Sequence, residues 1–105
     1  MPEMHFLVRW PEGDEMRCYS PSLVVHEYLE VGRAYAVGDF LARSRTMLHI
    51  ASERVRAKYG YACSAAMDQL AEIEARATTC AETGGGAVTV LAFELPASLA
   101  ESGRA

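Results

Sequence analysis

Three cysteines, three histidines and a run of basic residues are the side chains of this sequence that could do chemistry. They are Cys18, Cys63 and Cys80, His5, His26 and His49, and the basic residues Arg43, Arg45, Arg54, Arg56 and Lys58. No two histidines lie three or four residues apart, and there is neither a CxxC nor an HxxH pair. Protein metal sites commonly use such spacings, so we predict no metal site and no cofactor.

Cys63 is the candidate nucleophile, because it opens a predicted helix. The partial positive charge at a helix start would make its thiol more reactive. Cys63 also begins the apolar side of that helix, and this favours a buried structural role. We predict that Cys18 lies in the core and that Cys80 is exposed.

The sequence has no GxGxxG, Walker or GxSxG motif, so we assign no catalytic residue and favour a protein that is not an enzyme.

All five of these basic residues lie in one predicted helix, which also carries two acidic residues, Asp39 and Glu53. This gives the helix a charge of +3 and leaves −7 for the remainder of a chain whose net charge is −4. The side chains could form a solvated rim paired with acids of the next helix, Asp68, Glu72 and Glu74. They could also bind an anionic ligand or an acidic partner. If the helix binds an anion or an acidic partner, the candidate ligand-binding residues are Arg43, Arg54, Lys58 and Cys63.

Residues 39–60 form the helix that carries these side chains. Apolar or small residues recur at steps of three and four and mark one side of a helix: Phe40, Ser44, Met47, Leu48, Ala51, Val55 and Tyr59. We expect Asp39 or Gly38 to cap its start, and Gly60 to end it in a left-handed conformation.

The chain begins with a predicted hairpin, residues 3–10 and 14–20, joined by Pro11-Glu12-Gly13. The predicted register pairs Trp10 with Asp14, Val8 with Met16, and Phe6 with Cys18. It places Met4, Phe6, Val8, Met16 and Cys18 on one face.

Ser20 and Pro21 then open a short helix over residues 22–29. An extended link over residues 34–37 leads into the long helix. A second long helix runs from Cys63 to Ala77. Residues 84–86 are a glycine connector, residues 87–95 form a third strand, and residues 96–105 are a flexible C-terminal tail.

The fold class that follows is α+β. Residues 1–95 form a single domain, a two-layer sandwich in the order β-β-α-α-α-β, with helices on one face of a three-stranded, mainly antiparallel sheet. The last strand pairs beside the first. Leu7, Tyr19, Thr89, Leu91 and Phe93 would then lie on the uncovered face. So much apolar surface predicts a homodimer.

Composition restricts the partners and the compartment. The chain has 105 residues and a pI near 5.3, which argues against nucleic acid as a partner. No apolar run approaches the roughly 20 residues of a membrane span, so we expect no membrane partner. The first residues lack the pattern of a signal peptide, so we expect a cytoplasmic protein.

Several short stretches resemble one bacterial family, the small nitrogen starvation response proteins encoded beside a nitrilase. They cover roughly residues 1–75: Met1-Pro2-Glu3-Met4, Arg9-Trp10-Pro11, Cys18-Tyr19-Ser20-Pro21-Ser22, Asp39-Phe40, Ala42-Arg43-Ser44-Arg45-Thr46, Ala51-Ser52, Arg54-Val55-Arg56-Ala57-Lys58-Tyr59-Gly60 and Cys63-Ser64. The resemblance implies a cytoplasmic protein of nitrogen limitation, whose neighbouring genes encode a radical SAM enzyme, an acyltransferase and a flavoprotein. It implies no catalytic residues.

Three functions are consistent with these observations. The favoured one is a non-catalytic accessory subunit that binds an enzyme of the nitrilase cluster. The alternative is a protein that binds a small anionic ligand, or a small enzyme, using Cys63 and the arginine-rich helix. The third is a regulator that binds nucleic acid.

Overall fold

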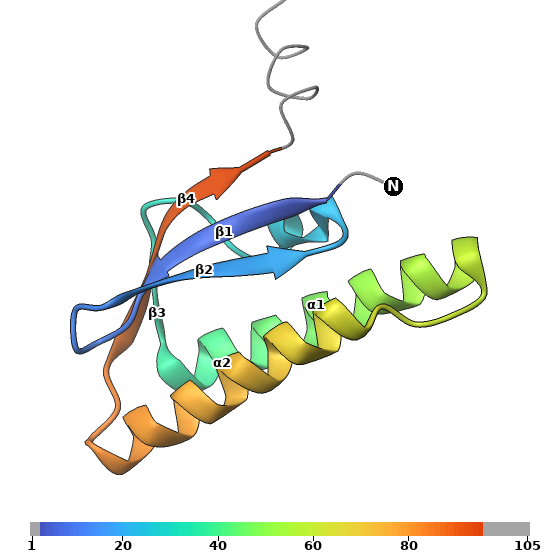
Figure 1. Cartoon of the computed structure of the whole chain (residues 1–105). Coiled ribbons are helices and arrows are strands. Elements are labelled where there is room, and N and C mark those ends of the chain that lie inside the picture. The colour runs from blue at the N-terminus through green and yellow to red at the C-terminus, as the bar shows by residue number, and fades with distance from the viewer. Residues whose placement is uncertain (1–2, 96–105) are drawn as a thin grey trace, which may run out of the picture.

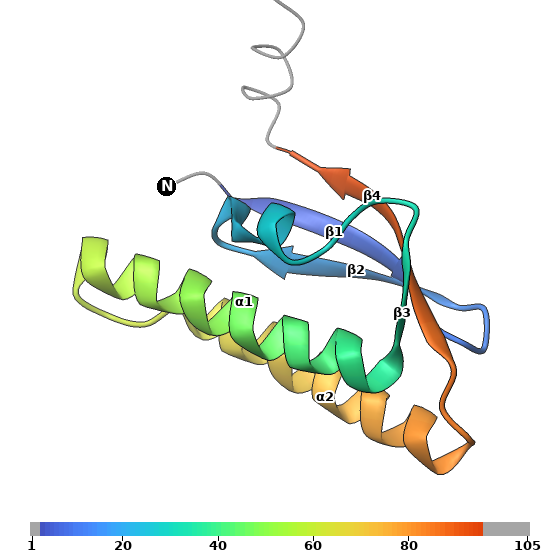
Figure 2. The same ribbon diagram turned by 180° about the vertical axis from the view of Figure 1, so that it is seen from behind.

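The computed structural model describes residues 3–95 of the chain, and these form an antiparallel sheet above two long helices. The elements are β1 (Met4–Arg9), β2 (Glu15–Ser20), the short 3-10 helix η1 (Leu23–Glu27), β3 (Ala34–Ala36), α1 (Val37–Tyr59), α2 (Ser64–Glu82) and β4 (Ala87–Glu94). Figures 1 and 2 show α1 and α2 side by side on one face of the sheet. The predicted α+β class is confirmed, whereas the predicted tail over residues 96–105 lies outside the described residues.

The N-terminal hairpin has the predicted register. Phe6 pairs with Cys18 and Val8 pairs with Met16. The turn closes where the backbone N–H of Trp10 donates to the carbonyl of Asp14 at 2.9 Å. This register turns Phe6, Val8 and Cys18 toward the helices, where all three are buried.

The sheet has four strands in the order β2-β1-β4-β3, one more than predicted. The sequence predicts an extended link before α1, but Ala34–Ala36 pairs antiparallel with Ala87–Thr89 of β4. Three residues are too few to show the two-residue period of a strand. Only the presence of β4 beside them makes this segment part of the sheet.

A bulge in β4 removes one residue from the predicted uncovered face of the sheet. The register of β4 against β1 shifts between Leu7 and Val8, so that Val8 pairs with Val90 while Phe6 pairs with Phe93. Paired residues lie on the same face, so Phe93 lies on the covered side with Phe6. There its ring contacts His26 of η1 at a centroid distance of 4.7 Å. The prediction that Phe93 faces outward was therefore wrong.

The long helix α1 is confirmed. Its C-terminal end agrees with the prediction, whereas its N-terminal end does not. Gly60 ends the helix with φ = 85°, as predicted. The start is at Val37, and neither Asp39 nor Gly38 caps it. Because β3 leads directly into α1, the N–H of Val37 instead donates to the carbonyl of Gly86 at 3.1 Å. The side chain of Asp39 accepts a hydrogen bond from Arg43.

The other two helices also depart from their predicted bounds. The opening serine of η1 is Ser22, whose hydroxyl accepts from the N–H of Val24, whereas the sequence predicts Ser20 in this position. Helix α2 continues five residues beyond the predicted end at Ala77. The extension brings Cys80 onto the same side as Ala77, where it is buried, so the prediction of an exposed Cys80 was wrong.

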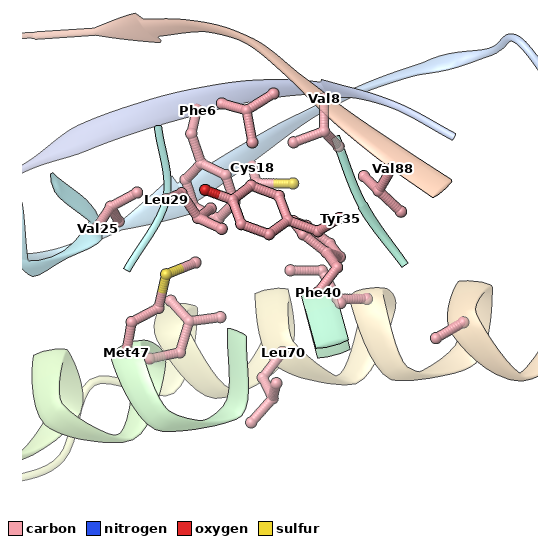
Figure 3. Close-up of a cluster of buried hydrophobic side chains, with 14 of the residues drawn as sticks. Phe6, Val8, Cys18, Val25, Leu29, Tyr35, Phe40, Met47, Leu70 and Val88 are labelled. Carbon is pink, nitrogen blue, oxygen red and sulfur yellow. The ribbon is translucent and has the colours of Figure 1, made fainter. Parts of the chain in front are cut away.

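The core lies between the sheet and the helices (Figure 3). Phe6 and Val8 point down from the sheet, Phe40 and Met47 point up from α1, and Leu70 comes from α2. Six of the seven residues of the predicted stripe on α1 are buried, whereas Tyr59, near the helix end, is not. Within residues 3–95 neither long helix is apolar over enough residues to cross a bilayer.

Candidate functional site

A hollow of about 340 Å³ lies at the end of the molecule where α1 turns into α2. Figure 1 shows that β1 starts and β2 ends at this same end. We call it the tyrosine hollow because three tyrosine side chains line it. Its lining consists of Glu3, Tyr19, Pro21, Val55, Tyr59, Tyr61, Ala62, Cys63, Ser64 and Ala65.

Two of the tyrosines stand on the rim of the hollow. Tyr59 is 50% exposed and Tyr61 is 67% exposed. Their ring centroids are 6.3 Å apart and their planes are tilted by 34°. The ammonium group of Lys58 lies over the Tyr59 ring, 5.6 Å from its centroid. An aromatic face attracts a cation at this distance, so the Tyr59 ring already contacts one positive charge.

The third tyrosine, Tyr19, is held from two sides. Its hydroxyl donates a hydrogen bond of 2.9 Å to the carboxylate of Glu3. Its backbone N–H donates to the side chain of Gln69 on α2, also at 2.9 Å. Partial burial raises the pKa of Tyr19, and the hydrogen bond to the Glu3 carboxylate raises it further. Tyr19 therefore stays a neutral donor at physiological pH and fixes the position of Glu3.

Cys63 lines the hollow at the start of α2 and is partly exposed. Its side chain makes no capping hydrogen bond to the helix. Cys18, in contrast, is buried, and this burial raises the pKa of its thiol. Among the three thiols, Cys63 is therefore the one that a reagent in solution can reach in the folded protein.

Of the four ligand-binding residues predicted from the sequence, the structure places only Cys63 in the lining of the hollow. Lys58 lies next to it, on the Tyr59 ring. Arg43 lies elsewhere, where it donates to the Tyr28 carbonyl at 2.7 Å and stacks on Tyr35.

The contacts of Arg54 are also with residues other than Cys63. It donates to the hydroxyl of Ser22 at 2.8 Å and lies 3.8 Å from the carboxylate of Glu27. These contacts attach η1 to α1. Arg45 pairs with Glu74 of α2 at 2.9 Å, as the interpretation of a paired rim predicts.

A larger hollow of about 450 Å³ lies between the start of α1 and the end of α2. Small and apolar residues such as Gly38, Leu41 and Ala77 line it, with Thr78 as its polar side chain. Ligand sites usually combine apolar walls with a few polar groups that fix orientation. The tyrosine hollow has such groups in Glu3, Cys63 and the tyrosine hydroxyls, so we take it as the candidate site.

The sequence did not point to Glu3, Pro21 or the tyrosines as a group. They fall into two groups that are about forty residues apart in the chain, and they belong to no motif. Two signals were present: Tyr59 ends the apolar stripe of α1, and Tyr61 follows the glycine that stops it.

Comparison with known proteins gives the family of the chain. A search of curated proteins and a search of solved structures found no significant match. A family described as nitrogen starvation-induced protein NitG matches residues 5–93, which include all seven elements except the first residue of β1 and the last residue of β4. The chain therefore belongs to the NitG family of nitrogen starvation-induced proteins.

Proposed function

We propose that this NitG-family chain serves the nitrogen starvation response by binding a small molecule in the tyrosine hollow. The observation that carries the proposal is the meeting of three tyrosine rings, a carboxylate and a thiol around about 340 Å³ of space. This volume lies within the range of roughly 300–1,000 Å³ that is usual for ligand sites.

Hydrogen bonds and core packing hold part of the wall of the hollow in place, which favours a preformed site. Tyr19 is fixed by Gln69 and Glu3. Val55 belongs to the buried side of α1, and Tyr59 occupies the last helical position before Gly60. A site that needs little rearrangement loses less free energy to ordering when a ligand binds.

The reactivity of Cys63 tests the proposal. We expect small metabolites, filtered from an extract of nitrogen-starved bacteria and freed of thiols that would consume the reagent, to slow alkylation of Cys63 by N-ethylmaleimide in the folded protein. A bound molecule would cover the thiol. Mass spectrometry of the digested protein gives the rate at each cysteine, and the buried Cys18 and Cys80 are internal controls for unfolding.

Two variants accompany this measurement. Tyr61→Ala removes a wall of the hollow and should weaken the protection, whereas His49→Ala changes an exposed residue of α1 and should leave it intact. If the extract leaves the rate at Cys63 unchanged in the wild-type protein, the hollow does not bind a small molecule and the proposal fails.

The exposed tyrosines favour a second candidate, the accessory subunit of a nitrilase-cluster enzyme. Tyrosine is enriched where proteins contact one another, and two exposed rings on one rim form such a surface. We expect a pull-down from nitrogen-starved cells to recover an enzyme of the cluster with wild-type protein and with His49→Ala, but not with Tyr61→Ala. Equal recovery by all three proteins, or none, would exclude this surface.

A further inference from the structure

We infer that the tyrosine hollow selects ligands that carry a primary ammonium group. This inference rests on the proposed small-molecule function and adds the chemistry of the ligand. It reverses the charge expected from the sequence, where the arginines of α1 suggested an anion. The arginines are engaged elsewhere, and the ionised group in the lining of the hollow is the carboxylate of Glu3.

The first argument is the carboxylate. Glu3 is exposed, and one of its oxygens accepts the hydrogen bond from Tyr19. A carboxylate has room for further donors, so its other oxygen can accept from a ligand. An ammonium group supplies three donors and a positive charge, and such charge-assisted hydrogen bonds are stronger than neutral ones.

The second argument is the aromatic lining. The faces of tyrosine rings carry negative electrostatic potential and attract a cation that lies over them, whether it is a lysine-type ammonium group or the cation of a ligand. The ring of Tyr59 shows this affinity within the molecule, since the ammonium of Lys58 lies over it. Lys58 therefore occupies one ring face and is a competing cation beside the site.

These two residues make the sign of the ligand's charge measurable. For an ammonium ligand, Glu3→Gln removes an attraction and should weaken binding by about fivefold, since an exposed ion pair contributes up to about 1 kcal/mol. Lys58→Met removes a competitor and a like charge, and should strengthen binding by about twofold. An anionic ligand would respond to both changes in the opposite direction.

The first experiment uses three probes that share a phenylethyl body. Phenethylamine carries only the ammonium group, phenylalanine carries both charges, and 3-phenylpropionate carries only the carboxylate. We expect phenethylamine and phenylalanine to slow the alkylation of Cys63 and to give a titration by calorimetry, and 3-phenylpropionate to do neither. A comparison of the first two shows whether the ligand class is simple amines or amino acids.

The second experiment separates this inference from the proposed function. The metabolite extract is treated with acetic anhydride, which converts primary amines into neutral amides. Under the inference, the untreated extract protects Cys63 and the acetylated extract does not. Protection by both extracts would overturn the ammonium inference and leave the proposed function intact. Protection by neither extract would overturn both.

The probe series has its own contradictory outcomes. Tighter binding of 3-phenylpropionate than of phenethylamine, or stronger binding of phenethylamine by Glu3→Gln, would overturn the inference. All variants are exposed at the changed residue, and their circular dichroism spectra should match the wild type. Arg33→Met, which removes an exposed cation beside Tyr35, is the matched control for Lys58→Met and should leave probe binding unchanged.

Discussion

At the scale of single residues, charged side chains of this protein connect segments that are distant in the chain. Arg76 of α2 shows this best. Its guanidinium lies over the ring of the buried Trp10, 5.4 Å from the centroid, and donates to both carboxylate oxygens of Asp14 in the hairpin turn. The hydrogen bonds from Arg76 lower the pKa of Asp14 below its ordinary value of 3.8. One ion pair therefore ties the first turn of the chain to the second long helix.

This lowered pKa predicts how stability depends on pH. A carboxyl whose folded pKa is lowered contributes stability above its unfolded pKa, and that contribution disappears as the pH falls through the folded value. We therefore expect Asp14→Asn to lower the free energy of unfolding at neutral pH, and the difference from wild type to shrink as the pH falls below about 3.8. Urea unfolding at a series of pH values measures this difference.

Glu12→Gln is the control for this experiment, because it removes the same charge from the same turn. It should change stability much less at neutral pH. A constant difference between wild type and Asp14→Asn from pH 7 to pH 2 would contradict the role given to the ion pair.

At the scale of secondary-structure elements, the connections determine where helices and strands end. Gly60 stops α1 with φ = 85°, and no atom of residues 3–95 lies within 4 Å of the position that a Cβ would take there. Gly86 joins α2 to β4 with φ = 126°, but there an added Cβ would lie 2.7 Å from the Cβ of Pro11. Gly60 is therefore needed only for its backbone conformation, whereas Gly86 also leaves room for Pro11 of the hairpin turn to pack against the connector.

The two glycines predict different costs of substitution. A positive φ costs a non-glycine residue about 1 kcal/mol, so Gly60→Ala should lower the free energy of unfolding by about that amount. Gly86→Ala adds a steric clash and should cost about 3 kcal/mol. Urea unfolding of both variants at one pH gives the two values. An equal effect of the two substitutions would show that the contact with Pro11 is unimportant.

At the scale of the whole molecule, one core holds both layers together. The ring of Trp10 meets Phe40 edge to face at 5.6 Å, which joins the hairpin to the first turns of α1. The opposite face of the sheet carries charge as well as apolar residues, since Arg17 of β2 pairs with Glu94 of β4 across β1. With Phe93 on the covered side, this face is less apolar than expected. The homodimer stays a prediction.

The sequence by itself determined the elements whose signals are local. The stripe of α1 needs only the 3.6-residue period of a helix, and the hairpin register needs only its turn and the alternation of Phe6 and Val8. The left-handed stop at Gly60 follows from the chemistry of glycine. These features could be predicted because each depends on residues that are neighbours in the chain.

Only the tertiary structure decided the features that join distant parts of the chain. Three residues became β3 because β4 lies beside them, and a bulge moved Phe93 to the other face. In the same way Glu3, Tyr19 and Tyr61 surround one hollow because a strand start, a strand end and a helix turn meet at one end of the molecule. No local period records such a meeting, since it depends on how the two layers are packed.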